Sequence, residues 1–98
     1  MTIHKERFGD VLDISLEGRL DAQSSRLFEN ELEQSYNGLH QLNIDFHGLE
    51  YISSAGLRVL LAAQRRMNLQ GSMIVSGANR QVMDVLDATG FSQMMTIC

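Results

Sequence analysis

The spacing of apolar residues in this chain switches repeatedly between the period of a strand and the period of a helix. Apolar residues occupy every second position of residues 12–16 and 42–46, which is typical of strands with one buried face. Between these stretches, apolar residues recur at every fourth position from 28 to 36, which is typical of a helix. Strands that alternate with helices in this way predict an α/β domain rather than a bundle or a sandwich.

Glycines and short polar segments mark where the elements begin and end, because the chain contains no proline. Gly9-Asp10 lies between two apolar-rich stretches and predicts a tight hairpin. Asp21 is a good N-cap for the first helix, which Asn37-Gly38 is expected to end, and Asn79 is a good N-cap for the last helix. Residues 48–52 are expected to form a loop. The expected order is strand (3–8), strand (11–16), helix, strand (42–46), helix to Gly71, strand (72–76), helix to Gly90, and a short strand (94–97).

The chain length and this order of elements define the expected fold class. The 98 residues fit one domain, so we expect a single domain over residues 1–98. A hairpin followed by strand–helix–strand connections predicts a mixed β-sheet of four to five strands with helices packed on it.

The charge balance argues against a nucleic-acid partner. The chain has twelve acidic and eight basic residues and a formal net charge of −4. Nucleic-acid-binding proteins gather Lys and Arg, because the phosphates supply most of the affinity. The densest basic run here is Arg65-Arg66, which lies within a helical pattern and is interpreted as a solvated helix face.

The sequence also predicts a cytoplasmic protein without direct membrane insertion. No apolar run approaches the roughly 18 residues of a membrane span. Residues 1–7 lack the charged-then-apolar layout of a signal peptide. Cys98 is the single cysteine, so it cannot form an internal disulfide, and a reduced setting is expected.

The segment that carries chemistry runs from a buried strand into the start of a helix. Two adjacent hydroxyl residues, Ser53 and Ser54, stand where this helix is expected to begin, and Gly56 falls in its first turn. A helix N-terminus favours an anion, because its N–H groups are unpaired and carry partial positive charge. Either serine can serve as a simple N-cap. A glycine inside a helix is interpreted here as a place where a partner approaches closely.

These residues resemble a known family signature. The run Asp45-Phe46-His47-Gly48-Leu49-Glu50-Tyr51-Ile52-Ser53-Ser54-Ala55-Gly56-Leu57 is similar to the signature of STAS domains, especially bacterial anti-sigma factor antagonists. The likeness extends to Gly18-Arg19-Leu20-Asp21, which is similar to the family's Gly-x-Leu-Asp ahead of its first helix. The expected order of elements matches the family over essentially the whole chain.

The resemblance implies partner switching. In that family, an unphosphorylated antagonist binds an anti-sigma factor that is also a serine kinase, and the sigma factor is freed. The kinase then phosphorylates the antagonist, and a separate serine phosphatase resets it. The family's phosphoacceptor lies two residues before the glycine of Gly-Leu, which implies Ser54 here, with Ser53 as the secondary candidate. The phosphate would come from ATP on the kinase, so no cofactor is expected.

The resemblance also implies a partner-binding rim and shows two departures from the family pattern. Ser53 replaces the aspartate that usually precedes the acceptor, and His47 stands where Ser or Thr is common. The helix beginning near Ser54 and the loop before Gly18–Asp21 are expected to form the docking face. The expected rim residues are Asp21, His47, Gly56, Leu57 and Arg58.

Two other functions remain open at this point. A hydrolase would use Ser54 and His47 as nucleophile and base, but the sequence has no Gly-x-Ser-x-Gly elbow. No phosphate-binding glycine loop or metal-ligand spacing is present either, so we expect no enzyme and no metal. The stronger alternative is a non-phosphorylated STAS subunit of a transporter or stress-signalling complex.

Overall fold

The chain folds into a five-stranded mixed sheet and four helices, and the computed structural model describes residues 1–98. The strands are β1 (Thr2–Phe8), β2 (Val11–Leu20), β3 (Gln41–Ile52), β4 (Ser72–Ser76) and β5 (Thr96–Ile97). The helices are α1 (Ala22–Glu33), α2 (Ser54–Gln70), α3 (Arg80–Ala88) and α4 (Phe91–Met94). The strands lie in chain order, with β1 and β2 antiparallel and the other pairs parallel. The predicted α/β class and mixed sheet are confirmed.

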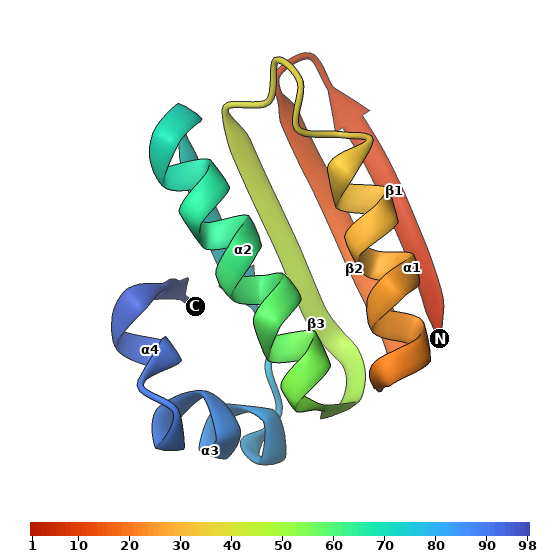
Figure 1. The fold of residues 1–98 in the computed structure, drawn as a ribbon, viewed down its shortest axis with the longest axis vertical. Coiled ribbons are helices and arrows are strands. Elements are labelled where there is room, and N and C mark those ends of the chain that lie inside the picture. Colours follow the sequence, from red (N-terminus) through yellow and green to blue (C-terminus); the bar gives the residue numbers. More distant parts are fainter.

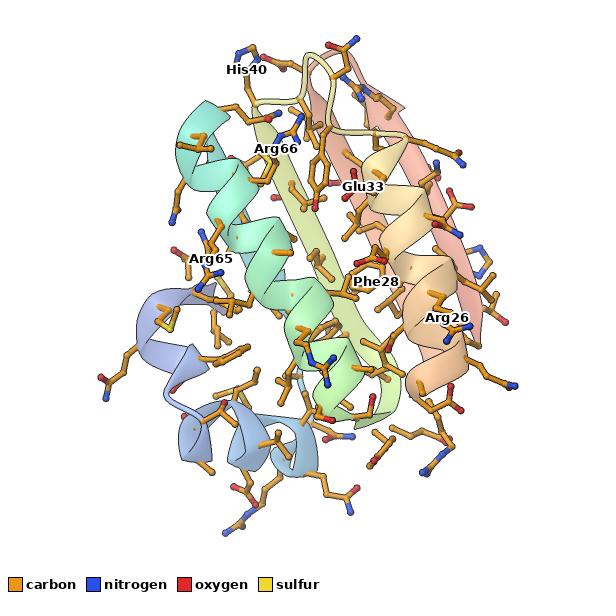
Figure 2. The ribbon with its side chains drawn as sticks, in the orientation of Figure 1. Arg26, Phe28, Glu33, His40, Arg65 and Arg66 are labelled. Atoms are coloured by element: carbon orange, nitrogen blue, oxygen red, sulfur yellow. The ribbon has the colours of Figure 1, made fainter.

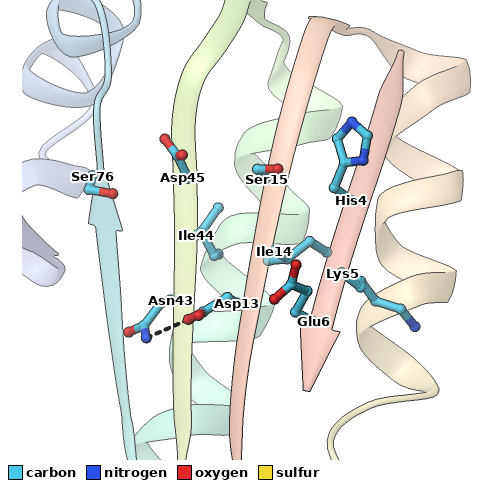
Figure 3. A pocket seen from close by; sticks show the side chains of 10 residues that line it. All are labelled: His4, Lys5, Glu6, Asp13, Ile14, Ser15, Asn43, Ile44, Asp45 and Ser76. Carbon is cyan, nitrogen blue, oxygen red and sulfur yellow. Dashed lines mark hydrogen bonds between the residues drawn. The ribbon is translucent and has the colours of Figure 1, made fainter. Parts of the chain in front are cut away.

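Helices α1 and α2 lie side by side on one face of the sheet (Figure 1), where α1 packs against β2 and α2 packs against β3 and β4. The opposite face is free of these helices and carries mainly polar side chains, as Figure 3 shows. On that face Asn43 Nδ2 donates a hydrogen bond to Asp13 Oδ1 at 2.8 Å. The sheet therefore has one apolar face covered by helices and one polar face.

The hydrophobic core lies between the sheet and the two helices. Paired core positions on β2 and β3, such as Ile14 and Ile44, point toward α1 and α2, and Phe28 of α1 is fully buried against them. Burial of one such side chain contributes about 1.5–3 kcal/mol to the free energy of folding. This core fixes the two helices on the sheet, and with them the positions at which both helices begin.

The first helix ends earlier than the sequence predicts. The predicted end at Asn37-Gly38 is wrong, because α1 stops at Glu33. The carbonyl oxygens beyond it are bound by Arg7, which donates to Ser35 O at 2.7 Å and to Asn37 O at 3.1 Å. Tyr36 keeps the fourfold apolar spacing and is buried, but it lies outside the helix.

The loops predicted for residues 48–52 and before Gly18–Asp21 are also wrong, because β3 continues to Ile52 beside a β2 that continues to Leu20. Two register shifts each place one extra residue in β3. Such bulges break the alternation of inward and outward side chains, and the buried positions change from every second residue to Leu49 and Ile52. The sequence signal for a strand therefore stops at residue 46, although the strand does not.

Glycine allows this longer pairing at one point. A Cβ on Gly48 would lie 2.7 Å from Glu17 Cγ on the neighbouring strand, so only glycine fits there without displacing β2. At the other end of the chain, the predicted strand 94–97 is shorter than expected, because Met94 ends α4 and β5 spans only Thr96–Ile97. None of the helices combines the length and the apolar character that a membrane span requires.

Candidate functional site

Both long helices begin at the same edge of the sheet. Leu20 ends β2 and Ile52 ends β3, and these two residues are paired across the parallel strands. The backbone N–H of Ser53 donates to Leu20 O at 2.9 Å, which joins the start of α2 to the start of α1. Because the carboxyl ends of parallel strands meet at one edge, the two helix N-termini lie next to each other (Figure 1).

The two adjacent serines have different environments. Ser53 is the N-cap of α2, is half-buried, and its Oγ accepts a hydrogen bond from the backbone N–H of Gly56 at 3.2 Å. Ser54 is the first residue of the helix and is exposed. Of these two hydroxyl groups, only that of Ser53 takes part in a hydrogen bond. Ser54 is thus the serine that a second protein can reach.

Gly56 does not serve the purpose that the sequence suggested. It is buried, and a Cβ at this position would lie 2.8 Å from Leu20 Cγ and 3.0 Å from Ile52 Cγ1. The missing side chain therefore makes room for the chain's own core rather than for a partner. Its expected place on the partner-binding rim is corrected on this ground, while its place in the first turn of α2 is as predicted.

Ser54 lies at a hollow of about 450 Å³ between the first halves of α1 and α2. Arg58 lines the same hollow one helical turn after Ser54. Helix α1 contributes Arg26 and Glu29 from the other side. The full lining is Ala22, Ser25, Arg26, Glu29, Ser54, Ala55, Arg58 and Val59.

The residues of α1 in this hollow were missed by sequence reasoning. Their spacing, with Arg26 and Glu29 three residues apart, places them on one helix face, and the sequence contains this signal. It does not show that this face meets α2, because that depends on how the two helices are aligned on the sheet. A basic and an acidic residue at that spacing are just as typical of an ordinary solvated helix surface as of a binding site.

Asp21 lies beside the start of α2 but in a different hollow. It is the N-cap of α1, and its Oδ1 accepts hydrogen bonds from the backbone N–H groups of Ser24 at 2.9 Å and Gln23 at 3.1 Å. Ser24 Oγ also donates to Asp21 Oδ1. These bonds, above all the one from the Ser24 backbone, lower the pKa of the Asp21 carboxyl. The exposed side of Asp21 faces a second hollow of about 420 Å³ that includes Arg19.

His47 does not join Ser54. It lies within β3 rather than in a loop, where its Nδ1 is 2.6 Å from Asp45 Oδ1 and its backbone N–H donates to the same oxygen at 2.9 Å. This backbone hydrogen bond is the main reason that the pKa of Asp45 is lowered. The ring is in contact range of Gly77, which directly follows β4. The ring is paired with Asp45, and His47 lies five residues before the end of β3. The extended strand therefore separates His47 from Ser54, and the structure does not bring them together as base and nucleophile.

The remaining predicted rim residues fall on α2. Arg58 is exposed, whereas Leu57 is half-buried and packs against the core. The structure thus brings together Ser54 and Arg58, keeps Ser53 and Leu57 beside them, and places Asp21 at the edge of the neighbouring hollow. The resulting site is an exposed hydroxyl at a helix start with two guanidinium groups in the same hollow.

Comparison with known proteins identifies the family of the chain. The family model described as the STAS domain matches residues 2–98. The chain belongs to the STAS domain family. The resemblance seen in the sequence is therefore confirmed.

Individual relatives of this STAS domain are anti-sigma factor antagonists. BtrV of Bordetella bronchiseptica, named as a candidate anti-sigma factor antagonist, is 29% identical over 99 residues, covering 99% of this chain and 85% of BtrV. The unphosphorylated anti-sigma factor antagonist SpoIIAA superposes with a TM-score of 0.87 at 18% identity, covering 99% of this chain and 88% of SpoIIAA.

The phosphorylated form of the Bacillus cell fate determinant SpoIIAA is also similar in fold. It superposes with a TM-score of 0.79 at 17% identity, covering 99% of this chain and 91% of that one. At these identities the superpositions show that the STAS domain shares its fold with SpoIIAA. They show the fold alone.

Proposed function

We propose that this STAS domain is an anti-sigma factor antagonist that binds an anti-sigma factor with serine kinase activity while Ser54 is unmodified. Phosphorylation of Ser54 ends the complex, and a serine phosphatase restores it. The observation that carries this proposal is the difference between the two serines, because Ser53 is engaged as the N-cap and Ser54 is exposed. The similarity to BtrV supports the class of partner.

The position of Ser54 makes phosphorylation compatible with the folded domain. A phosphate adds about −1.5 to −2 charge at neutral pH. At the first position of α2 this charge is placed beside the positive end of the helix, so the helix is not destabilised. A partner docked over the same surface meets the new charge directly. Binding can therefore be switched off without refolding either protein.

The proposal assigns no catalytic step to this chain. The kinase supplies ATP and the groups that transfer its γ-phosphoryl group, and Ser54 Oγ is the acceptor. The docking face consists of the start of α2 and the neighbouring end of β2 with Asp21, which lie together because Leu20 and Ile52 are paired. Leu57 and Arg58 flank the acceptor within this face.

The first test is capture of partners from the native host with this domain as bait, followed by mass spectrometry of the bound proteins and of the bait. We expect an ATP-binding kinase-like protein and phosphate on Ser54. Ser54→Ala should abolish labelling by the captured kinase, whereas the matched control Ser53→Ala should still be labelled. Labelling that persists in Ser54→Ala would refute the site assignment.

A second variant separates the proposal from a constitutive subunit. Ser54→Asp places a negative charge at the acceptor position, and we expect it to weaken binding of the captured kinase. A stable complex that contains unmodified serines and is unaffected by Ser54→Asp would identify the domain as a non-phosphorylated subunit of a larger assembly.

A further inference from the structure

Two arginines from opposite helices face the hollow that contains Ser54. Arg58 follows Ser54 by one turn of α2, so the two side chains lie on the same helix face. Arg26 comes from α1 and lines the hollow from the other side. Figure 2 shows Arg26 toward the end of the helix pair at which both helices begin, away from Arg66 at the other end.

These two guanidinium groups are unengaged, whereas Lys5, Arg7 and Arg66 have partners within the domain. Lys5 forms an ion pair with Glu31 at 2.6 Å, and Arg7 donates three hydrogen bonds to backbone carbonyl oxygens. Arg66 lies over the ring of Tyr36 and donates to Gln70. The four ion pairs of the structure involve neither Arg26 nor Arg58.

The hollow is locally positive although the chain as a whole is negative. Its charged lining consists of Arg26, Arg58 and Glu29, which sum to +1, whereas the whole chain carries −4. Guanidinium groups bind phosphate and carboxylate oxygens through paired N–H donors. Both kinds of anion are therefore suitable ligands for Arg26 and Arg58.

We propose that Arg26 and Arg58 bind carboxylate groups of the partner when Ser54 is unmodified, and close over the phosphate when Ser54 is phosphorylated. The inference rests on the proposed function, in which Ser54 is the acceptor. The phosphate then acts in two ways, because it adds negative charge and also withdraws the two guanidinium groups from the partner. The fitting partner presents an acidic surface to the start of α2.

Glu29 opposes the phosphate within this arrangement. Its carboxylate lies on α1 three residues after Arg26 and lines the same hollow. In the unmodified domain it moderates the positive charge of the hollow, and in the phosphorylated domain it repels the phosphate. Replacing Glu29 by glutamine should therefore tighten the hold of the two arginines on phosphate.

The test uses phosphoserine incorporated at position 54 during translation, so that no kinase is required. The readout is the second ionisation of the phosphate, followed by ³¹P NMR, which has a pKa of about 6 in an unperturbed phosphoserine. Nearby guanidinium groups favour the doubly charged form. We expect the acid dissociation constant to be roughly threefold to tenfold larger in the parent domain than in Arg26→Ala/Arg58→Ala, given the exposure of the site.

Three matched variants sharpen this test. Arg65→Ala removes an arginine of α2 that lines another hollow, and it should leave the phosphate pKa unchanged. Glu29→Gln should lower the phosphate pKa further. Arg26→Lys/Arg58→Lys keeps the charge with a different donor geometry and should retain part of the shift. A phosphate pKa that is equal in the parent and in both double variants would overturn the inference.

The second arm measures binding of the unmodified domain to the captured kinase. Arg26→Ala/Arg58→Ala should weaken this complex by about tenfold or more, since two interfacial charge pairs are lost, whereas Arg65→Ala should not. Unaltered binding would overturn the inference that Arg26 and Arg58 bind carboxylate groups of the partner. The ³¹P measurement needs neither kinase nor partner. If the phosphate pKa does not shift but Ser54 is labelled normally, only the proposed binding of the phosphate by Arg26 and Arg58 is refuted. A domain that no kinase labels refutes the proposed function instead.

Discussion

The two ends of the α1–α2 pair differ in how their polar side chains are used. At the end where α2 finishes, Gln70 Nε2 donates to Tyr36 O at 2.6 Å and to Leu39 O at 2.5 Å, and Arg66 lies 5.0 Å from the centroid of the Tyr36 ring. At the end where both helices begin, Arg26 and Arg58 have no such partners and face the hollow of Ser54. We call the end with Tyr36, Arg66 and Gln70 the fastened end, because these residues bind one another. We call the end with Arg26 and Arg58 the open end, because these side chains have no partner within the domain.

The difference shows how a small domain separates stability from recognition. An arginine that covers a buried ring and binds a neighbouring amide contributes to folding, and it cannot also serve an incoming protein without loss of stability. Arginines that are exposed and unpaired contribute little to folding, so they can exchange one anion for another. The comparison predicts that substitutions at the fastened end change stability and that substitutions at the open end change binding.

The largest expected effect is at the fastened end. Tyr36→Ala removes a buried ring and the surface on which Arg66 rests, and should lower the free energy of unfolding by about 3–5 kcal/mol. Urea unfolding followed by circular dichroism measures this. Leu69→Ala is the control at the same end, because Leu69 is 86% exposed, and it should change stability by less than about 0.5 kcal/mol. Similar losses in both variants would contradict the role given to Tyr36.

The same ring predicts a loss of stability at alkaline pH. Burial raises the pKa of Tyr36 from 10.0 to about 12. Because the folded-state pKa lies above the unfolded value, this contribution to stability is complete below pH 10 and is lost as the pH rises toward 12. The chain has two tyrosines, so in Tyr51→Phe the absorbance at 295 nm reports Tyr36 alone. Half-ionisation near pH 10 in the folded protein would contradict the packing of this ring.

At the open end, substitution of the two serines should change the free energy of unfolding by clearly different amounts. Ser53→Ala removes the N-cap of α2 and should lower the free energy of unfolding by about 1 kcal/mol. Ser54→Ala should change it by less than about 0.5 kcal/mol. The two variants compared in one urea series test the assignment, and a larger loss for Ser54→Ala would exchange the roles of the two residues.

The smallest expected effect concerns the N-cap of α1. Hydrogen bonds from Ser24 lower the folded-state pKa of Asp21 below 3.8, so its contribution to stability is present above pH 3.8 and is lost as the pH falls through the folded-state value. Asp21→Asn keeps a capping side chain that does not titrate. The stability difference between the parent and Asp21→Asn should therefore shrink below pH 3.8. A difference that is constant from pH 7 to pH 2 would show that the carboxylate charge is irrelevant.

The sequence predicts the order of the elements except α4, which it does not indicate, and it predicts the starts of the three longer helices. The reasons for these successes are local. Asp21 and Asn79 were recognised as N-caps because their side chains bond the backbone of their own helices, a contact that needs no tertiary information. The end of α1 was misplaced because it depends on Arg7, which reaches the carbonyl groups of Ser35 and Asn37 from another strand. The extension of β3 was missed because its bulges suppress the period of two.

The candidate site was predictable only in part, for the same reason. Ser54 and Arg58 lie one turn apart on a single helix, so the sequence brings them together. Arg26 and Glu29 join them only because the core sets α1 beside α2. His47 lies near Ser54 in sequence, but the continuation of β3 separates the two residues. Gly56 was interpreted as a surface feature, although the atoms that require it are those of Leu20 and Ile52.

The hydrogen bond between Ser53 N and Leu20 O has a consequence for how such domains diversify. It joins the starts of the two helices through the backbone, so the spacing of the two helix starts does not depend on the side chains that line the hollow. Those side chains can be exchanged without altering the backbone that presents the Ser54 hydroxyl group. Under the proposed function, a cell with several such domains can therefore give each one its own partner by varying a few surface residues of α1 and α2, while every domain keeps the same backbone around the serine.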